Sequence, residues 1–216
     1  MYKILVINPN SNVVVTEKMQ DSFDNHSSTR SVEVDCITLS RAPFGIETDA
    51  DIKFVEPLVI NKISDELKNY DAFIIACYSD PGLNKATQIF KKPIYGIHET
   101  SIKFCTKLRQ NFGVIALGDE SIQRHINYIK ALNLESYYIG ENALNISVNE
   151  AVSDESTFRK IIMSGRDLIV KKGVEMIILG CAGLVKHRVA VERELGVKVI
   201  DPVQTTVEVA VDNLIN

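Results

Sequence analysis

The sequence predicts an α/β protein built from two similar halves, each with a mostly parallel sheet. Short apolar runs alternate with amphipathic helical stretches along the 216 residues. The runs are rich in β-branched residues and largely continuous, which is typical of parallel strands covered on both faces. The strand ends also follow a similar spacing in both halves of the chain. Together these patterns indicate an α/β fold with parallel sheets.

Strands and helices can be placed from this alternation in chain order. Strands are expected at the short apolar runs, and helices where apolar residues recur every three or four positions. The helix expected at residues 155–172 ends in Lys171-Lys172-Gly173, two cations and a glycine that are typical of a helix C-terminus. The expected strands are 3–7, 32–39, 72–77, 94–97, 112–117, roughly 136–139, 176–181 and 198–200, and the expected helices are 53–68, 121–132 and 155–172.

The spacing of strand ends indicates an internal repeat. Cys77 follows Ile7 by 70 residues, and Cys181 follows Leu117 by 64. The next strand ends 20 residues after Cys77 in the first half and 19 residues after Cys181 in the second. This pattern favours two sub-domains facing each other across a cleft, and a single continuous doubly wound sheet is the alternative. The two sub-domains would comprise residues 1–98 with 206–216, and residues 99–205.

Composition argues against several classes of function. The formal net charge is only −4 and no run of Lys and Arg occurs, so a nucleic-acid surface is not expected. No apolar stretch reaches the roughly 18 residues that span a bilayer, and the N-terminal run is unlike a signal peptide. The four cysteines include no CxxC pair, which predicts neither a disulfide framework nor a metal clip. We therefore expect a cytoplasmic protein with reduced thiols and no nucleic-acid or membrane partner.

Two cysteines occupy matching positions in the two halves. Cys77 and Cys181 each end a buried apolar run and precede small or turn-forming residues and then a helix. Open α/β sheets bind ligands at the carboxyl ends of their strands, and a helix N-terminus favours a thiolate. Two facing thiols can remove a proton from one side of a carbon and return one on the other side. The chemistry expected is inversion of a stereocentre, with charge on the adjacent carbonyl stabilised by backbone N–H groups of the two turns.

Other interpretations of the cysteines remain open. A cysteine at the end of a buried strand is often a small core residue, and a redox disulfide between the pair is a second possibility. Cys36 and Cys105 are expected to be structural. The polar loop after the first strand contains Asn10 and Ser11, which either cap a helix or bind a substrate carbonyl or carboxylate.

Three segments resemble the Asp/Glu/hydantoin racemase family, and in particular its hydantoin and allantoin racemase branch. The segments are Ile7-Asn8-Pro9-Asn10-Ser11, residues 76–83 (ACYSDPGL) and residues 180–184 (GCAGL). The resemblance covers essentially the whole chain. It implies two α/β sub-domains related by a pseudo-twofold axis, a homo-oligomer, and a two-base mechanism that uses neither pyridoxal phosphate nor a metal.

The same resemblance implies roles for individual residues. Cys77 and Cys181 would be the acid–base pair. A second group would hold the carbonyl or imide groups of the substrate, namely Asn10, Ser79, Ala182 and Gly183. Residues 41–47 match a pocket-lining loop of this branch, so Phe44 is expected to touch the substituent on the stereocentre.

Departures from related activities narrow the substrate class. Arylmalonate decarboxylases resemble this chain but have glycine at the first cysteine position, so Cys77 argues against that activity. Glutamate and aspartate racemases typically carry an acidic residue in the first loop and Thr-His after the second cysteine. This chain has Asn8-Pro9-Asn10 and Ala182-Gly183 instead. We therefore expect a neutral cyclic ureide, a 5-substituted hydantoin, as substrate. Allantoin or an amino acid is the alternative, as is a non-catalytic ureide- or amino-acid-binding protein.

Five further polar residues are assigned structural roles. Asp80 is expected to cap the helix that follows it, with Pro81 at the first helical position. Glu99 is expected at a helix start, with His98 at the edge of the cleft. His26 and His125 are expected at the surface.

Overall fold

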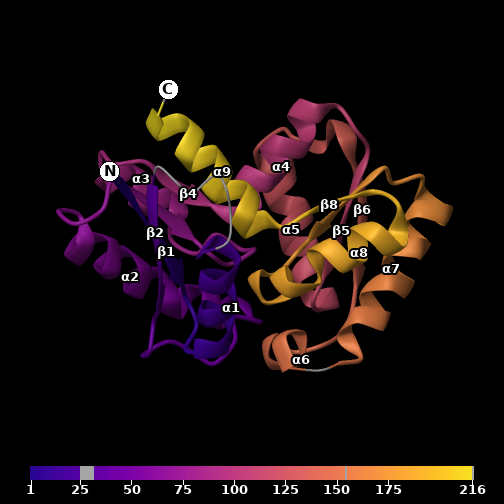
Figure 1. Ribbon diagram of the computed structural model, residues 1–216, viewed down its shortest axis with the longest axis horizontal. Coiled ribbons are helices and arrows are strands. Elements are labelled where there is room, and N and C mark those ends of the chain that lie inside the picture. Colours follow the sequence, from indigo (N-terminus) through magenta and orange to yellow (C-terminus); the bar gives the residue numbers. More distant parts are fainter. Residues whose placement is uncertain (25–31, 154, 216) are drawn as a thin grey trace.

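The computed structural model describes residues 1–24, 32–153 and 155–215 (Figure 1). It contains two separate four-stranded sheets with parallel pairing throughout. The first sheet has the order β2-β1-β3-β4 and the second the order β6-β5-β7-β8. In each half the strands therefore lie in the same order, counted from the first strand of that half. This confirms the prediction of two similar halves. The alternative of one continuous sheet is wrong for the described part of the chain.

The strands lie close to their predicted positions. In chain order they are β1 (Tyr2–Asn8), β2 (Val32–Thr38), β3 (Ala72–Ile75), β4 (Ile94–Gly96), β5 (Phe112–Ala116), β6 (Tyr138–Ala143), β7 (Met176–Leu179) and β8 (Lys198–Ile200). β3 and β7 end two residues before Cys77 and Cys181, so both cysteines lie in the turns that follow the strands. β6 begins two residues later than predicted because residues 135–137 form a 3₁₀ turn.

Helices cover both faces of each sheet, as the continuous apolar strands require. They are α1 (Val13–Asp24), α2 (Asp49–Glu66), α3 (Leu83–Ile89), α4 (Ile97–Leu108), α5 (Asp119–Ala131), α6 (Val148–Ser153), α7 (Thr157–Lys172), α8 (Arg188–Leu195) and α9 (Pro202–Ile215), with a 3₁₀ helix η3 at Ala182–His187. α2 begins four residues before the predicted position, because Thr48 and Asp51 form a capping box that satisfies its first N–H groups.

The two halves share one apolar core. Ile4 of β1, Ile102 of α4, Phe112 of β5 and Val207 of α9 belong to one buried cluster. α4 and α9 pack against each other between the sheets (Figure 1). Burying each such side chain contributes about 1.5–3 kcal/mol, so this layer holds the two sheets in a fixed relation. The sub-domain boundaries at residues 98, 99 and 205 stay a prediction.

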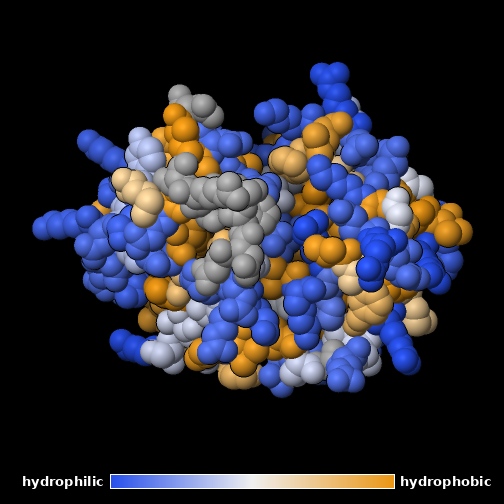
Figure 2. Space-filling view, in the orientation of Figure 1, coloured by the Kyte–Doolittle hydropathy of each residue, from blue (hydrophilic) through white to orange (hydrophobic). Residues whose placement is uncertain are grey.

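In the described ranges, no helix is long and apolar enough to cross a membrane. Figure 2 shows hydrophilic and hydrophobic residues interspersed over the visible face.

Candidate active site

A cavity of about 640 Å³ opens at the carboxyl ends of both sheets. Its wall includes residues that follow β1 and β3, the two inner strands of the first sheet, and β5 and β7, the two inner strands of the second. Cys77 lies in it from the first half and Cys181 from the second. The structure therefore brings the two predicted cysteines to one cavity.

The two cysteine turns are built in the same way. Ala76 N–H donates to the Ile7 carbonyl at 2.9 Å, and Gly180 N–H donates to the Ile115 carbonyl at 2.9 Å, so each turn is tied to the central strand of its sheet. The Cys181 sulfur accepts a hydrogen bond from Gly183 N–H at 3.3 Å. The backbone N–H of Ser79 lowers the pKa of Cys77, as the backbone N–H of Gly183 lowers the pKa of Cys181. In each turn this N–H belongs to the residue two positions after the cysteine.

Burial controls the acidity of both thiols. It raises the pKa of Cys77 to about 12 and the pKa of Cys181 to about 11, and the N–H groups of Ser79 and Gly183 only partly offset it. The expected lowering of the thiol pKa by a helix N-terminus is therefore outweighed by burial. Both side chains are nonetheless partly exposed, since they face the cavity.

The charged residues near the two sulfurs are not the same. Beside the dominant effect of burial, Asp80 raises the pKa of Cys77 and Arg124 lowers it. Glu47 and Asp201 raise the pKa of Cys181. The two thiols are therefore similar in backbone geometry but different in electrostatic surroundings.

Asn10 lies in a buried amide network that borders the cavity. Its side-chain oxygen accepts hydrogen bonds from Asn8 Nδ2 at 3.0 Å and from Asn12 N–H at 2.9 Å. Among the described residues, no hydrogen bond is recorded for its Nδ2. Because Asn10 lines the cavity, its amide nitrogen is the group that can face a ligand.

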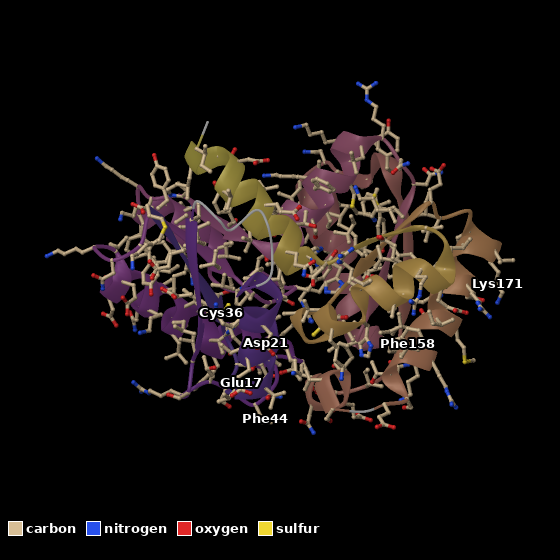
Figure 3. The ribbon with its side chains drawn as sticks, in the orientation of Figure 1. Glu17, Asp21, Cys36, Phe44, Phe158 and Lys171 are labelled. Atoms are coloured by element: carbon tan, nitrogen blue, oxygen red, sulfur yellow. The ribbon has the colours of Figure 1, made fainter. Side chains whose placement is uncertain are left out.

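The other predicted binding residues divide into two groups. Ser79, Ala182 and Gly183 line the cavity. Phe44 does not belong to the lining, and its side chain is 56% exposed at the edge of the molecule (Figure 3). The loop that carries Phe44 does reach the cavity, but through Ile46, Glu47 and Thr48.

Asp80 caps a different helix from the one predicted. α3 begins at Leu83 with Gly82 as its N-cap, so Asp80 is too early to cap it. The Asp80 carboxylate instead accepts hydrogen bonds from His98 N–H at 3.0 Å and Glu99 N–H at 2.8 Å, at the start of α4. Asp80 N–H donates to the Cys77 carbonyl at 2.9 Å. Asp80 therefore ties the Cys77 turn to α4.

The histidine predictions need correction. His125 is buried, with 2% of its surface exposed, and it lines the cavity. Its spacing of four residues from the buried Ile129 on α5 is the sequence signal that indicates an inward face. His98 is also buried and is not at the cavity edge, although Glu99 does lie in the first turn of α4 as expected. His26 lies outside the described residues.

A metal centre is not evident among the residues the structure describes, which hold no group of three or more His, Cys, Asp or Glu side chains able to bind an ion. The polar groups that line the cavity are instead the two thiols, amides, hydroxyls and a few charged side chains.

The fold and the cavity define an α/β protein of two similar parallel-sheet units with a site between them. Residues 4–210 match the family model of the Asp/Glu/hydantoin racemases, and the chain belongs to that family. A hydantoin racemase from Pseudomonas sp. strain NS671 is 32% identical over 96% of this chain and 84% of that protein. A hydantoin racemase from Paenarthrobacter aurescens is 28% identical over 96% of this chain and 89% of that protein.

Solved structures show the same fold. Allantoin racemase from Klebsiella pneumoniae superimposes with a TM-score of 0.91 and 22% identity, covering 100% of this chain and 88% of that chain. Glutamate racemase from Francisella tularensis gives a TM-score of 0.69 and 19% identity, covering 99% of this chain and 81% of that chain. With its family established, the chain is an enzyme, an isomerase of the racemase type.

Proposed function

We propose that this racemase inverts the C5 stereocentre of 5-substituted hydantoins without a cofactor, with Cys77 and Cys181 as the acid–base pair. The observation that carries the proposal is the cavity itself, which receives one cysteine from each half on turns of the same construction. One thiolate removes the C5 proton, and the opposite thiol returns a proton to the other face.

The sequence predicts that the backbone N–H groups of the two cysteine turns stabilise charge on the substrate carbonyl, but they act on the sulfur atoms instead. The Gly183 N–H donates to the Cys181 sulfur, and the Ser79 N–H lowers the pKa of Cys77, so each favours the thiolate of its own turn. The charge on the substrate carbonyl then needs other donors. The Asn10 amide nitrogen and the Ser79 hydroxyl line the cavity and supply such donors.

The charge of the cavity supports a neutral substrate. Glu47, Asp119 and Glu120 line it, against the single guanidinium of Arg124. An excess of carboxylates disfavours the free carboxylate of an amino acid, because like charges repel at short range. A hydantoin ring carries no such carboxylate. The two hydantoin racemases at 32% and 28% identity point to the same substrate class.

The proposal is tested by proton NMR in deuterated water with enantiopure 5-benzylhydantoin. We expect the C5 proton signal and the optical rotation to disappear together, faster than in the absence of enzyme. Allantoin, aspartate and glutamate are run alongside. Faster exchange of allantoin or of an amino acid would replace the hydantoin assignment, and binding without exchange of any of them would support a non-catalytic binding protein.

The rate should increase with pH above neutrality. Burial raises the pKa of both thiols, to about 12 for Cys77 and about 11 for Cys181, so the thiolate needed as base is scarce at neutral pH. Its population increases about tenfold per pH unit below the lower pKa, and we expect kcat/KM to increase in parallel between pH 7 and 9. Initial exchange rates, corrected for the titration of the substrate itself, measure this. A profile that is flat over this range would contradict the assignment of a thiol base.

The proposal also includes a reducing cytoplasmic setting, since catalytic thiols must stay reduced, and a homo-oligomer. Light scattering of the purified protein measures the oligomeric state.

A further inference from the structure

A cluster of buried aromatic and imidazole rings lies beside the Cys77 turn. Tyr78 follows Cys77 directly, and its ring centroid lies 4.2 Å from that of His98 and 5.0 Å from that of His125. Tyr78 and His125 line the cavity, whereas His98 does not. The cluster joins the first half to α5 of the second half, and His125 is its imidazole on the cavity side.

His125 is held by a buried carboxylate. Its Nδ1 lies 2.8 Å from Glu141 Oε2, and the side chains of the two residues are 3% and 0% exposed. Glu141 comes from β6, the edge strand of the second sheet. Burying a carboxylate has a high desolvation cost unless it is paired, so this arrangement fixes the His125 ring strongly.

The pairing leaves one nitrogen of the ring for the cavity. A carboxylate hydrogen-bonded to Nδ1 occupies that nitrogen and sets the orientation of the ring, as in other carboxylate–histidine pairs at functional sites. In the described part of the chain, His125 Nε2 has no recorded hydrogen bond, and it is not among the fully buried polar atoms that lack a partner. Because His125 lines the cavity, Nε2 is the ring nitrogen left for a ligand there.

We propose that His125 is a further catalytic residue, with its Nε2–H donating to the carbonyl oxygen next to C5, and that Glu141 is its positioning residue. This inference rests on the proposed racemase chemistry. When C5 loses its proton to a thiolate, the electron pair moves onto the neighbouring carbonyl oxygen. The His125 Nε2–H strengthens its hydrogen bond to that oxygen without giving up its proton, and the hydrogen bond weakens again when the other thiol reprotonates C5.

Such a donor acts mainly on the transition state. The hydrogen bond is stronger to the enolate oxygen than to the neutral carbonyl, so its loss lowers kcat more than it raises KM. Removal of one donor of this kind lowers kcat by about 10²–10³-fold. Loss of a supporting carboxylate has a smaller effect, about 10–100-fold.

The test compares His125→Gln and Glu141→Gln with the matched control His98→Gln. All three positions are buried, and His98 contacts the same Tyr78 ring without lining the cavity. We expect kcat of His125→Gln to decrease about 10²-fold or more with KM changed by less than about threefold. Glu141→Gln should show a smaller decrease in kcat, whereas His98→Gln should stay close to the wild type.

The possible failures can be told apart. If the wild type exchanges no substrate of the panel, the proposed function fails. If the wild type is active and His125→Gln loses no more activity than His98→Gln, only the role of His125 is overturned. Should His125→Gln not fold, ¹⁵N NMR of histidine-labelled wild type decides the question. Added 5-benzylhydantoin must then shift the Nε2 resonance of His125 and leave that of His98 in place, and an unshifted His125 signal overturns the inference.

Discussion

Replacing either Cys77 or Cys181 by serine is expected to lower the rate of racemisation by about 10³-fold or more. General acid–base catalysis contributes about 10²–10⁴-fold per group, and a serine hydroxyl is far less acidic than a thiol. Because the two sulfurs belong to different halves and face one cavity, each variant loses the group for one face of the substrate. Polarimetry and proton exchange on both enantiomers measure the loss.

The single variants should also separate exchange from inversion. A variant that keeps only one thiol can still exchange the C5 proton of the enantiomer that faces it, while inversion is lost in both directions. Cys36→Ser is the matched control, since Cys36 lies in β2 and does not line the cavity. Full racemisation by Cys77→Ala would contradict the two-base scheme.

The strands and the cysteine turns could be predicted because their signals are local. The run from Ile4 to Ile7 is almost completely buried, and a continuous apolar run is what a parallel strand inside two helix layers requires. The small and turn-forming residues after each cysteine are likewise visible in the sequence. β6 is harder to place, because it is an edge strand that contains Gly140 and Glu141 and has no comparable apolar run.

The roles of Asp80 and His125 depend on partners that are distant in the sequence. The carboxylate of Asp80 binds the start of α4, 18 residues later, instead of the helix beside it. His125 pairs with Glu141, which lies 16 residues later on β6, the edge strand that has no continuous apolar run. Helix periodicity places His125 on an inward face, but only tertiary packing shows that this face meets both a carboxylate and the cavity. For Phe44 the local resemblance points to the cavity, yet the chain turns so that Ile46 and Glu47 reach it instead.

Gly96→Ala is expected to destabilise the fold by about 3 kcal/mol or more. A Cβ at Gly96 would overlap the Asp80 carboxylate, since it would lie inside van der Waals distance of the carboxylate carbon and 2.5 Å from Oδ1. The backbone at Gly96 is extended, with φ −102° and ψ 140°, so the effect is steric and not conformational. The carboxylate would have to leave the N–H groups of His98 and Glu99, which would then lose this partner. Urea unfolding measures the change in the free energy of unfolding.

A matched control and a double variant isolate the cause. Gly118 is also a helix N-cap with extended backbone, and a Cβ there meets no atom within 4 Å, so Gly118→Ala should change stability by less than about 0.5 kcal/mol. On an Asp80→Ala background, where the carboxylate is absent, Gly96→Ala should lose most of its effect. If Gly96→Ala lowered the free energy of unfolding equally in the wild type and in the Asp80→Ala variant, the steric explanation would be contradicted. Because the Asp80 N–H also donates to the Cys77 carbonyl, Gly96→Ala should slow racemisation as well, while Cys36→Ser should not.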